Sequence, residues 1–341
     1  VYDHPRVLIF GKEPGFSRER VATLLGAVPL HGARQVTPKQ ASRLYRSTWP
    51  SSLSPPRSDH PPPAPARAPT GSFGATVRWL VGLELSALAA FCLLCPFLGV
   101  ARDRGYAVSK TLGWLAPGYL VVVACGLGLT PSTPDAARGA ALLLWTAGAL
   151  AAWRHRERLK GFVREQRGEW MTVQAVFWSA FGLFALLRAL NPAIFWGEKP
   201  MDFGILNALY RSRTLPPLDP WFAGEPLDYF YFGHALVATA GRITGVPPAL
   251  AFNLGIATLG ALLASTAFAA GRQWGGRRSG LLAAGGTVLL GNLAGVRLAL
   301  AEPGGALDFD FFWATSRVIP GTINEFPFWS LLFGDLHAHL L

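Results

Sequence analysis

The chain has 341 residues, and its 31 Lys and Arg residues against 20 Asp and Glu residues give a net charge of +11. Only 15% of the residues are charged and 51% are hydrophobic, compared with about 25% and about 45–50% in soluble domains. The three cysteines lie inside apolar stretches, so no disulfide framework is indicated. This composition excludes a disordered acidic protein, a disulfide-stapled secreted domain and an ordinary soluble enzyme, and it indicates a polytopic membrane protein.

The first 75 residues are polar and rich in proline, and they divide into two parts. Residues 1–29 form a short folded tail, with a strand-like run at 7–10 and a helix predicted from Ser17 through Leu25. Residues 30–75 are interpreted as a proline-rich linker, a solvated tether whose arginines could also touch anionic lipid. The membrane domain is placed at residues 76–341. Because the chain begins at Val1 and ends where an apolar run begins, we expect a fragment of a longer protein.

Six apolar runs are long enough to cross a membrane, since a spanning helix needs about 20 mostly apolar residues. They are residues 79–100, 111–129, 136–153, 170–190, 248–271 and 279–300. A seventh run begins at Phe326 and is cut off, and residues 229–247 are either a short span or a helix beside the membrane. The predicted fold is an all-α polytopic membrane protein of about seven to eight spanning helices, the last one truncated.

Basic residues assign the loops to the two sides of the membrane. The loop 154–169 holds six basic residues against three acidic ones. Together with the basic loops 101–110 and 272–278 it is placed in the cytoplasm, whereas the carboxylate-rich segments 191–228 and 301–325 are placed outside. This alternation holds only if residues 229–247 do not cross; otherwise the later loops invert. The positive charge thus belongs mainly to the cytoplasmic loops and the linker, and no nucleic-acid partner is expected.

The first outer segment carries closely spaced carboxylates beside aromatic residues. On a helix, Glu198 and Asp202 would share a face and repel each other unless a cation, a proton or a substrate separated them. Such a group indicates a functional site, although a hydrated loop with an interfacial belt of Trp and Tyr is the plainer alternative. The substrate-binding candidates in and after this segment are Lys199, Asp219, Trp221, Asp228, Tyr229, Tyr231 and His234.

The second outer segment, residues 313–339, adds Arg317 and Glu325 as substrate-binding candidates. It ends with Asp335, His337 and His339, which would line one side of an extended chain and could bind a divalent metal. The alternative is an Asp helix cap followed by interfacial histidines.

Inside the first span, Glu84 is a lone carboxylate that needs a partner or a water-filled cavity, and Arg188 and Arg297 are candidate partners.

Four runs in the two outer segments resemble the "YYY" family of uncharacterised prokaryotic multi-spanning membrane proteins. They are GEKPMD at 197–202, PLDPWFAG at 217–224, DYFYFGH at 228–234 and SRVIPGTINEFPFWSLLFGDLHAH at 316–339. The resemblance covers roughly residues 77–341. This chain has Phe230 in place of the middle one of three tyrosines, and Ala338 where the family often has Pro. Since tandem copies of the membrane unit are known in this family, residues 1–7 are expected to be the tail of a preceding unit.

The family is similar to the type C glycosyltransferases, which use lipid-phosphate-linked sugars and keep a catalytic acid in the first large external loop. By position, this resemblance implies Glu198 and Asp202 as the catalytic carboxylates. We therefore expect a multi-pass cell-membrane enzyme that transfers a sugar from a polyprenyl-phosphate donor at the outer face. One of the two carboxylates would act as general base, and Lys199 and Arg317 would stabilise the departing phosphate.

The remaining site candidates are given roles in the same reaction, and two other functions are considered as alternatives. Trp221, Tyr229 and Tyr231 would stack on the sugar or lie among the headgroups of membrane lipids. Asp335, His337 and His339 would bind a metal or the sugar. The alternatives are a transporter or lipid flippase that uses Glu84, Arg188 and Arg297, and a non-catalytic membrane scaffold. An enzyme requires both outer segments to meet at one site, whereas a transporter requires the intramembrane charges to line a central route.

Overall fold

The computed structural model describes residues 72–195, 197–222, 224–301 and 309–337, and six residues nearer the N-terminus. The chain divides into two units, Val1–Thr70 and Gly71–Leu341. In the first unit, Glu19, Ala22, Thr23 and Gly26 are helical, in agreement with the helix predicted there. The strand-like run at 7–10 and residues 30–70 of the predicted linker lie outside the described residues.

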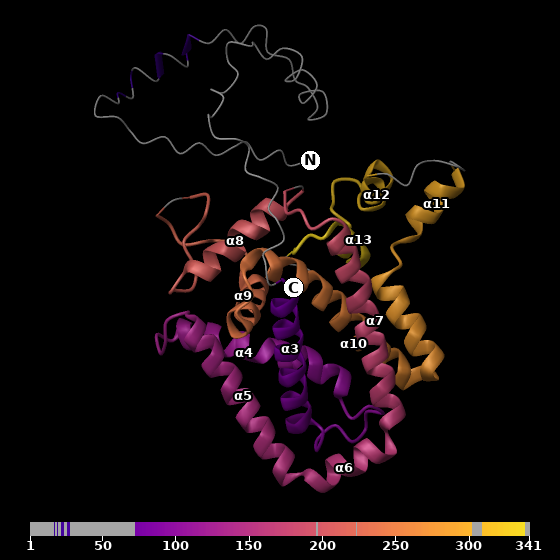
Figure 1. Ribbon diagram of the computed structural model, residues 1–341. Coiled ribbons are helices and arrows are strands. Elements are labelled where there is room, and N and C mark those ends of the chain that lie inside the picture. The colour runs from indigo at the N-terminus through magenta and orange to yellow at the C-terminus, as the bar shows by residue number, and fades with distance from the viewer. Residues whose placement is uncertain are drawn as a thin grey trace. The chain divides into compact units, whose positions relative to one another are not determined.

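The described part of the second unit is helical and contains no strand (Figure 1). Five of its helices are long and apolar enough to cross a membrane: α3 (Ser72–Leu94), α4 (Tyr106–Gly126), α5 (Pro134–Arg154), α7 (Arg167–Leu190) and α10 (Pro248–Val288). Shorter helices connect or cover them: α6 (Arg156–Glu165), α8 (Lys199–Arg211), α9 (Phe232–Thr244), α11 (Leu293–Ala301), α12 (Phe309–Thr315) and α13 (Pro327–Phe333). The all-α, multi-pass prediction is confirmed.

The ends of the first spanning helices follow from local sequence. α3 begins at Ser72 rather than at residue 79, and it takes in the last four residues of the predicted linker. It ends before Pro96, which cannot continue a helix. α5 begins after Thr133, whose hydroxyl accepts a hydrogen bond from the Ala136 backbone N–H at 3.2 Å. Pro134 stands at the first helical position, where its missing N–H costs nothing.

α10 is a helical hairpin rather than one straight helix. Its helical conformation is broken at Gly276, which has φ 85° and ψ −168°. The two arms touch on either side of this turn: a Cβ on Gly271 would lie 2.7 Å from the Cβ of Ala283, and one on Gly280 would lie 2.8 Å from the Phe268 ring. Small residues at a helix seam permit such close approach. The arms correspond to the predicted segments 248–271 and 279–300, and the basic loop 272–278 forms the turn.

The second arm does not continue to residue 300, which corrects the predicted span 279–300. α10 ends at Val288 and α11 starts anew at Leu293. Between them, Gly291 packs so closely that a Cβ would lie 2.6 Å from the Phe326 ring. Asn292 donates to the Thr315 carbonyl at 2.6 Å and accepts from the Ala294 backbone N–H at the start of α11. The break is therefore fixed by contacts with the second outer segment.

The predicted seventh span is also wrong in the described residues. α13 starts at Pro327 but ends after seven residues at Gly334, whose φ of 69° terminates the helix. A side chain cannot replace this glycine without conflict, because a Cβ would lie 2.4 Å from Nη1 of Arg188. The chain then continues without regular secondary structure through Asp335 and His337.

Residues 229–247 hold α9, which has 13 residues. At 1.5 Å per residue it is about 20 Å long, shorter than the ~30 Å hydrocarbon core. His234 near its start contacts Asp202 of α8, and Arg78 near the start of α3 donates to the Thr244 carbonyl at its end. α9 therefore packs within one end of the helix bundle without crossing it. The described chain has five candidate spans instead of seven to eight.

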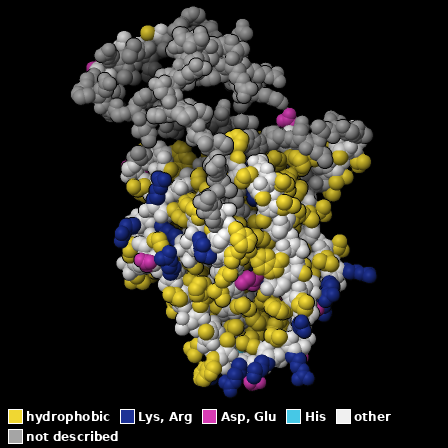
Figure 2. Space-filling view, viewed as in Figure 1, with side chains coloured by type: hydrophobic (Ala, Val, Ile, Leu, Met, Phe, Trp, Pro, Cys, Tyr) yellow, Lys and Arg dark blue, Asp and Glu magenta, His cyan; other side chains and the backbone are white. Residues whose placement is uncertain are grey.

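The two ends of the bundle differ in character. α8, α12 and α13 lie at one end, which we call the site end, and α6 lies at the other (Figure 1). Apolar side chains cover much of the flank between them, and Lys and Arg side chains gather around α6 (Figure 2). The basic residues that the sequence predicts to face the cytoplasm therefore gather at the α6 end, opposite the site end.

Candidate functional site

The two outer segments meet at the site end. Nζ of Lys199 lies 3.3 Å from Oδ1 of Asp335, and Nδ1 of His337 lies 3.1 Å from Oε2 of Glu198. Segments that are far apart in the sequence are therefore in direct contact, as a shared site requires. We refer to the carboxylates Glu198, Asp202, Glu325 and Asp335, with Lys199, His234 and His337 beside them, as the carboxylate cluster.

A glycine turn in each outer segment directs the chain toward the cluster. Gly197 has φ 68°, a left-handed conformation that favours glycine, and it turns the chain into α8. Pro200 falls in the first turn of α8, where proline is compatible with a helix. On the other segment, Gly334 ends α13 and directs Asp335 inward, where Oδ1 of Asp335 would lie 3.6 Å from a Cβ on Gly197. Each segment thus presents its charged residues immediately beside a glycine turn.

His337 lies among three carboxylates. Its Nδ1 faces Glu198, and its Nε2 lies 3.5 Å from Oε2 of Glu325 and 3.7 Å from Oδ2 of Asp335. Burial lowers the pKa of His337, but the hydrogen bond to Glu198 and the charges of Asp335 and Asp202 outweigh it and raise the pKa to about 9. The ring is therefore an imidazolium at neutral pH and neutralises part of the carboxylate charge.

Asp335 is ionised at neutral pH in spite of its burial. Burial raises its pKa to about 6, and the charges of Lys199 and His337 oppose that rise. Burial also lowers the pKa of Lys199, while Asp335 raises it. The two side chains are 5% and 7% exposed, so their ion pair is an internal contact between α8 and the chain after α13.

Asp202 and His234 form a fully buried pair beside the cluster. Oδ1 of Asp202 and Nε2 of His234 are 3.3 Å apart, and the side chains are 1% and 0% exposed. Oδ2 of Asp202 and Nδ1 of His234 have no hydrogen-bond partner among the described residues. Burial raises the pKa of Asp202, although the hydrogen bond with His234 lowers it. A buried carboxylate of this kind supports the site from inside and is closed to a bulky substrate.

Arg188 is a component of this region that sequence reasoning did not place there. It lies in the last turn of α7 and is buried, with Nε donating to Oδ1 of Asn253 at 2.7 Å and Nη2 donating to the Ala193 carbonyl at 3.3 Å. Its guanidinium lies against Gly334. The sequence does show an arginine near the end of an apolar span, which is a signal of a functional or paired charge. It does not show which residues Arg188 contacts, because Asn253 and Gly334 are distant in the sequence.

Arg317 and Glu325 form the edge of the cluster in the second segment. Their closest charged atoms are 3.6 Å apart, and the Arg317 side chain is 24% exposed. The guanidinium lies 4.0 Å from the centre of the Trp313 ring, a cation–π contact that holds it in place. Arg317 is thus a partly accessible cation beside the buried charges.

The aromatic candidates have different surroundings. Tyr229 is 43% exposed, and burial together with the charges of Glu198 and Asp202 raises its pKa, which places it near the cluster. Phe230 packs edge-to-face on it at 5.7 Å. Tyr231 is half-buried against the core, and Asp228 is exposed. Of this group, Tyr229 is the aromatic residue whose pKa is affected by the carboxylates of the cluster.

Two further candidates have structural contacts. Oδ1 of Asp219 accepts hydrogen bonds from the backbone N–H groups of Trp221 and Phe222 at 2.7 and 3.0 Å, so it closes a turn. The Trp221 ring packs over Gly204 of α8, where a Cβ would lie 2.5 Å from it. Asp219 and Trp221 therefore shape the loop after α8 and attach it to that helix.

The predicted metal ligands are only partly visible. His339 lies outside the described residues, and both ring nitrogens of His337 face carboxylates. Within residues 72–337, apart from the gaps at 196, 223 and 302–308, no three His, Cys, Asp or Glu side chains are arranged to hold a metal ion. A divalent metal remains an expectation from the sequence.

The charges named for a transport route do not lie together. Glu84 pairs with Lys110 at 2.7 Å and accepts a hydrogen bond from Gln174 at 3.5 Å, so its predicted pairing with Arg188 or Arg297 is wrong. Arg188 lies at the site end, and Arg297 is exposed on α11. Glu84 and Lys110 instead join α3 to α4 inside the bundle.

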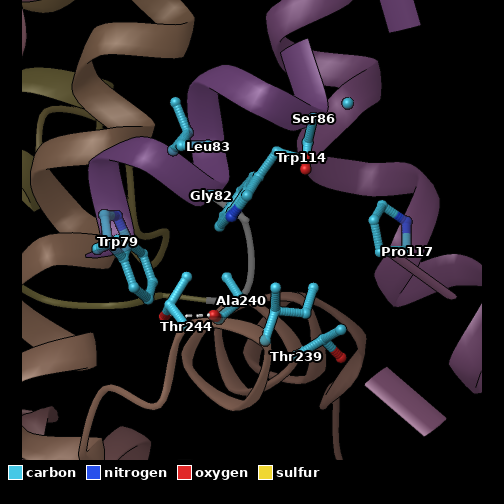
Figure 3. Close-up of a pocket in the computed structure, with 11 residues that line it drawn as sticks. Trp79, Gly82, Leu83, Ser86, Trp114, Pro117, Thr239, Ala240 and Thr244 are labelled. Atoms are coloured by element: carbon cyan, nitrogen blue, oxygen red, sulfur yellow. Dashed lines mark hydrogen bonds between the residues drawn. The ribbon is translucent and has the colours of Figure 1, made fainter. Parts of the chain in front are cut away.

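An apolar pocket between α3, α4 and α9 is too small for a substrate. Figure 3 shows Trp79, Trp114, Pro117 and Thr244 around it. Its volume of about 20 Å³ is enough for roughly one water molecule. The carboxylate cluster, and not this pocket, is therefore the candidate functional site.

Comparison with known proteins identifies the family. The family described as uncharacterized membrane protein (DUF2298) matches residues 117–341, which is 225 of the 341 residues. No protein of curated function matches the chain, and no solved structure matches it. The matched region contains α5 to α13 and the whole carboxylate cluster. The chain belongs to this family of uncharacterized membrane proteins.

Proposed function

We propose that the protein is an integral membrane glycosyltransferase that takes a sugar from a polyprenyl-phosphate donor at the outer face. The observation that carries the proposal is the meeting of the two outer segments through Lys199–Asp335 and Glu198–His337. A cluster of carboxylates and cations at the predicted outer face offers both a proton acceptor and cations for a phosphate. The resemblance to type C glycosyltransferases supports the same reaction class by analogy.

Exposure selects the general base between the two predicted carboxylates. The side chain of Glu198 is 29% exposed, compared with 12% for Glu325, 7% for Asp335 and 1% for Asp202. A general base must come within hydrogen-bond distance of the hydroxyl whose proton it takes. We therefore assign this role to Glu198, and we assign Asp202 a supporting role with His234.

The proposed step is a displacement at the anomeric carbon of the sugar. As the acceptor oxygen forms its bond to C1, Glu198 takes the hydroxyl proton. The bond between C1 and the phosphate oxygen breaks, and its electron pair leaves with the lipid phosphate. Arg317, the partly exposed cation at the edge of the cluster, stabilises that phosphate. Lys199 is 5% exposed and paired with Asp335, so it acts through the local field rather than by direct contact.

The test is sugar transfer from labelled polyprenyl-phosphate sugars by membranes that contain the full-length parent protein. Glu198→Gln should lower the rate by about a hundredfold or more, the usual contribution of a general base. Glu225→Gln is the matched control, because Glu225 is an exposed carboxylate of the same outer segment and forms no ion pair with the cluster among the described residues. Full activity of Glu198→Gln would show that Glu198 is not the general base. If correctly inserted protein transferred sugar from none of the donors, the proposal that it is a glycosyltransferase would be wrong.

A further inference from the structure

The end of the bundle opposite the carboxylate cluster has a hollow of its own. It lies where α5 turns into α6, has a volume of about 450 Å³ and is lined by Arg154, His155, Arg156, Glu157 and Arg158. The hollow is a surface depression, open to solvent and lined by five consecutive residues, so it suits a headgroup that is only partly enclosed. Figure 1 shows α6 connecting the ends of α5 and α7 there.

The positive charge of this hollow is not balanced by its own residues. Three guanidinium groups and one carboxylate line it. The Glu157 carboxylate lies 3.0 Å from Lys160 and 3.5 Å from Arg156, so it is already shared between two cations. In the described part of the chain, Arg154 and Arg158 have no ion-pair partner. The hollow therefore concentrates unneutralised guanidinium groups, whose planar forks match phosphate oxygens.

The length of α5 is consistent with a hollow at the level of the lipid headgroups. α5 has 21 residues and is about 31 Å long, close to the ~30 Å hydrocarbon core, so a membrane-spanning α5 would have Arg154 at the edge of that core. Exposed apolar side chains also occur on the helices that meet at this corner: Trp153, next to Arg154, is 67% exposed, and Val163 of α6 and Met171 of α7 are 51% and 52% exposed. A headgroup bound by the arginines would leave its acyl chains beside these side chains. In Figure 2 the Lys and Arg side chains gather around the same end of the bundle.

We propose that this hollow binds the phosphate of an anionic phospholipid of the cytoplasmic leaflet. The guanidinium groups of Arg154, Arg156 and Arg158 would contact the phosphodiester, and the apolar side chains beside them favour a lipid over a free phosphate. The site lies at the other end of the molecule from the carboxylate cluster. It therefore stands whether or not the protein transfers a sugar.

The test measures binding of phosphatidylglycerol to purified protein in neutral detergent, with phosphatidylcholine, whose choline cation offsets its phosphate charge, as the zwitterionic reference. The triple variant Arg154→Gln/Arg156→Gln/Arg158→Gln should bind phosphatidylglycerol roughly a hundredfold more weakly, since each basic residue at a membrane surface contributes about 1 kcal/mol. The matched control removes three exposed arginines of the same end that lie outside the hollow: Arg164→Gln/Arg167→Gln/Arg277→Gln. It should weaken binding no more than about threefold at physiological salt, where charges more than ~8 Å apart are largely screened.

Equal losses in the two triple variants would overturn the proposal, because they would indicate a diffuse positive field instead of a site. Equal binding of phosphatidylglycerol and phosphatidylcholine by the wild-type protein would overturn it too. Displacement of the lipid by inorganic phosphate at similar concentration would assign the hollow to a free phosphate. Should the triple variant not fold, Arg158→Gln alone should lower the affinity roughly fivefold, and an unchanged affinity would count against the site.

Discussion

Protonation of His337 should make the stability of the protein depend on pH between about 6.5 and 9. The imidazolium faces Glu198, Glu325 and Asp335, and its loss would remove a positive charge from a cluster in which Lys199 pairs with Asp335 and Arg317 with Glu325. The pKa of His337 rises from 6.5 to about 9 in the folded protein. One pKa unit corresponds to about 1.4 kcal/mol, so the protonated ring contributes about 3 kcal/mol to folding.

The sign follows from the direction of the shift. A histidine whose folded-state pKa is raised stabilises the protein fully below pH 6.5 and loses that contribution as the pH rises to about 9. Asp335 affects stability at lower pH. Burial raises its pKa from 3.8 to about 6, so the free energy of unfolding falls as the pH rises from about 3.8 to about 6. Buried Asp202 also has a raised pKa and acts with the same sign, so the part of the fall above pH 6.5 that His337→Gln removes is the part attributable to His337.

The assay is the free energy of unfolding of purified protein in a neutral detergent, measured from pH 6 to 10. Wild-type protein should lose about 3 kcal/mol across the window, and His337→Gln should be less stable at pH 6 and nearly flat above it. His155→Gln, at the α5–α6 corner, should retain the wild-type dependence. An unchanged slope in His337→Gln would refute the reasoning, because the proton would then be bound elsewhere.

Two further predictions concern the packing of the bundle. Lys110→Met should destabilise the protein by about 3 kcal/mol, because it leaves the Glu84 carboxylate inside the bundle without its cation. Lys110→Met/Glu84→Gln should restore most of that loss in the same unfolding assay, and equal losses in both variants would contradict the ion-pair explanation. Gly334→Ala should cost about 1–3 kcal/mol, because the added Cβ would meet Arg188 at a position with φ 69°. Gly285→Ala is its control, since nothing lies within 4 Å of a Cβ at that helical position; no loss of stability is expected there, and a similar loss in both variants would refute the role of Gly334.

The spanning helices were predictable because the membrane imposes a local rule. A span needs a continuous apolar run of about 20 residues, and the runs that became α3, α4, α5 and α7 satisfy it in sequence alone. The errors lie where a helix ends through contact with a distant residue. Gly291 meets Phe326, and Gly334 meets Arg188, so α10 and α13 stop where composition alone would continue them.

The sequence allowed several residues of the carboxylate cluster to be predicted, but not the contacts between them. Carboxylates beside aromatic residues at a membrane surface drew attention to Glu198, Asp202 and Asp335. The pairing of Lys199 with Asp335 and of Glu198 with His337 depends on how α8 and α13 pack, which no spacing rule encodes. For Asp219 the residue type suggested substrate binding, whereas in the structure its carboxylate accepts hydrogen bonds that close a local turn.

The arrangement of charge explains why two neighbouring carboxylates should have separate roles. Glu198, the residue just before α8, and Asp202, in its first turn, are four residues apart, and like charges at that spacing repel. Each has acquired a histidine, His337 for Glu198 and His234 for Asp202. His234 is fully buried with Asp202, whereas His337 lies beside the partly exposed Glu198. The repulsion expected from the sequence is therefore relieved by two histidines from different segments, and of the two pairs the one with Glu198 is the more exposed.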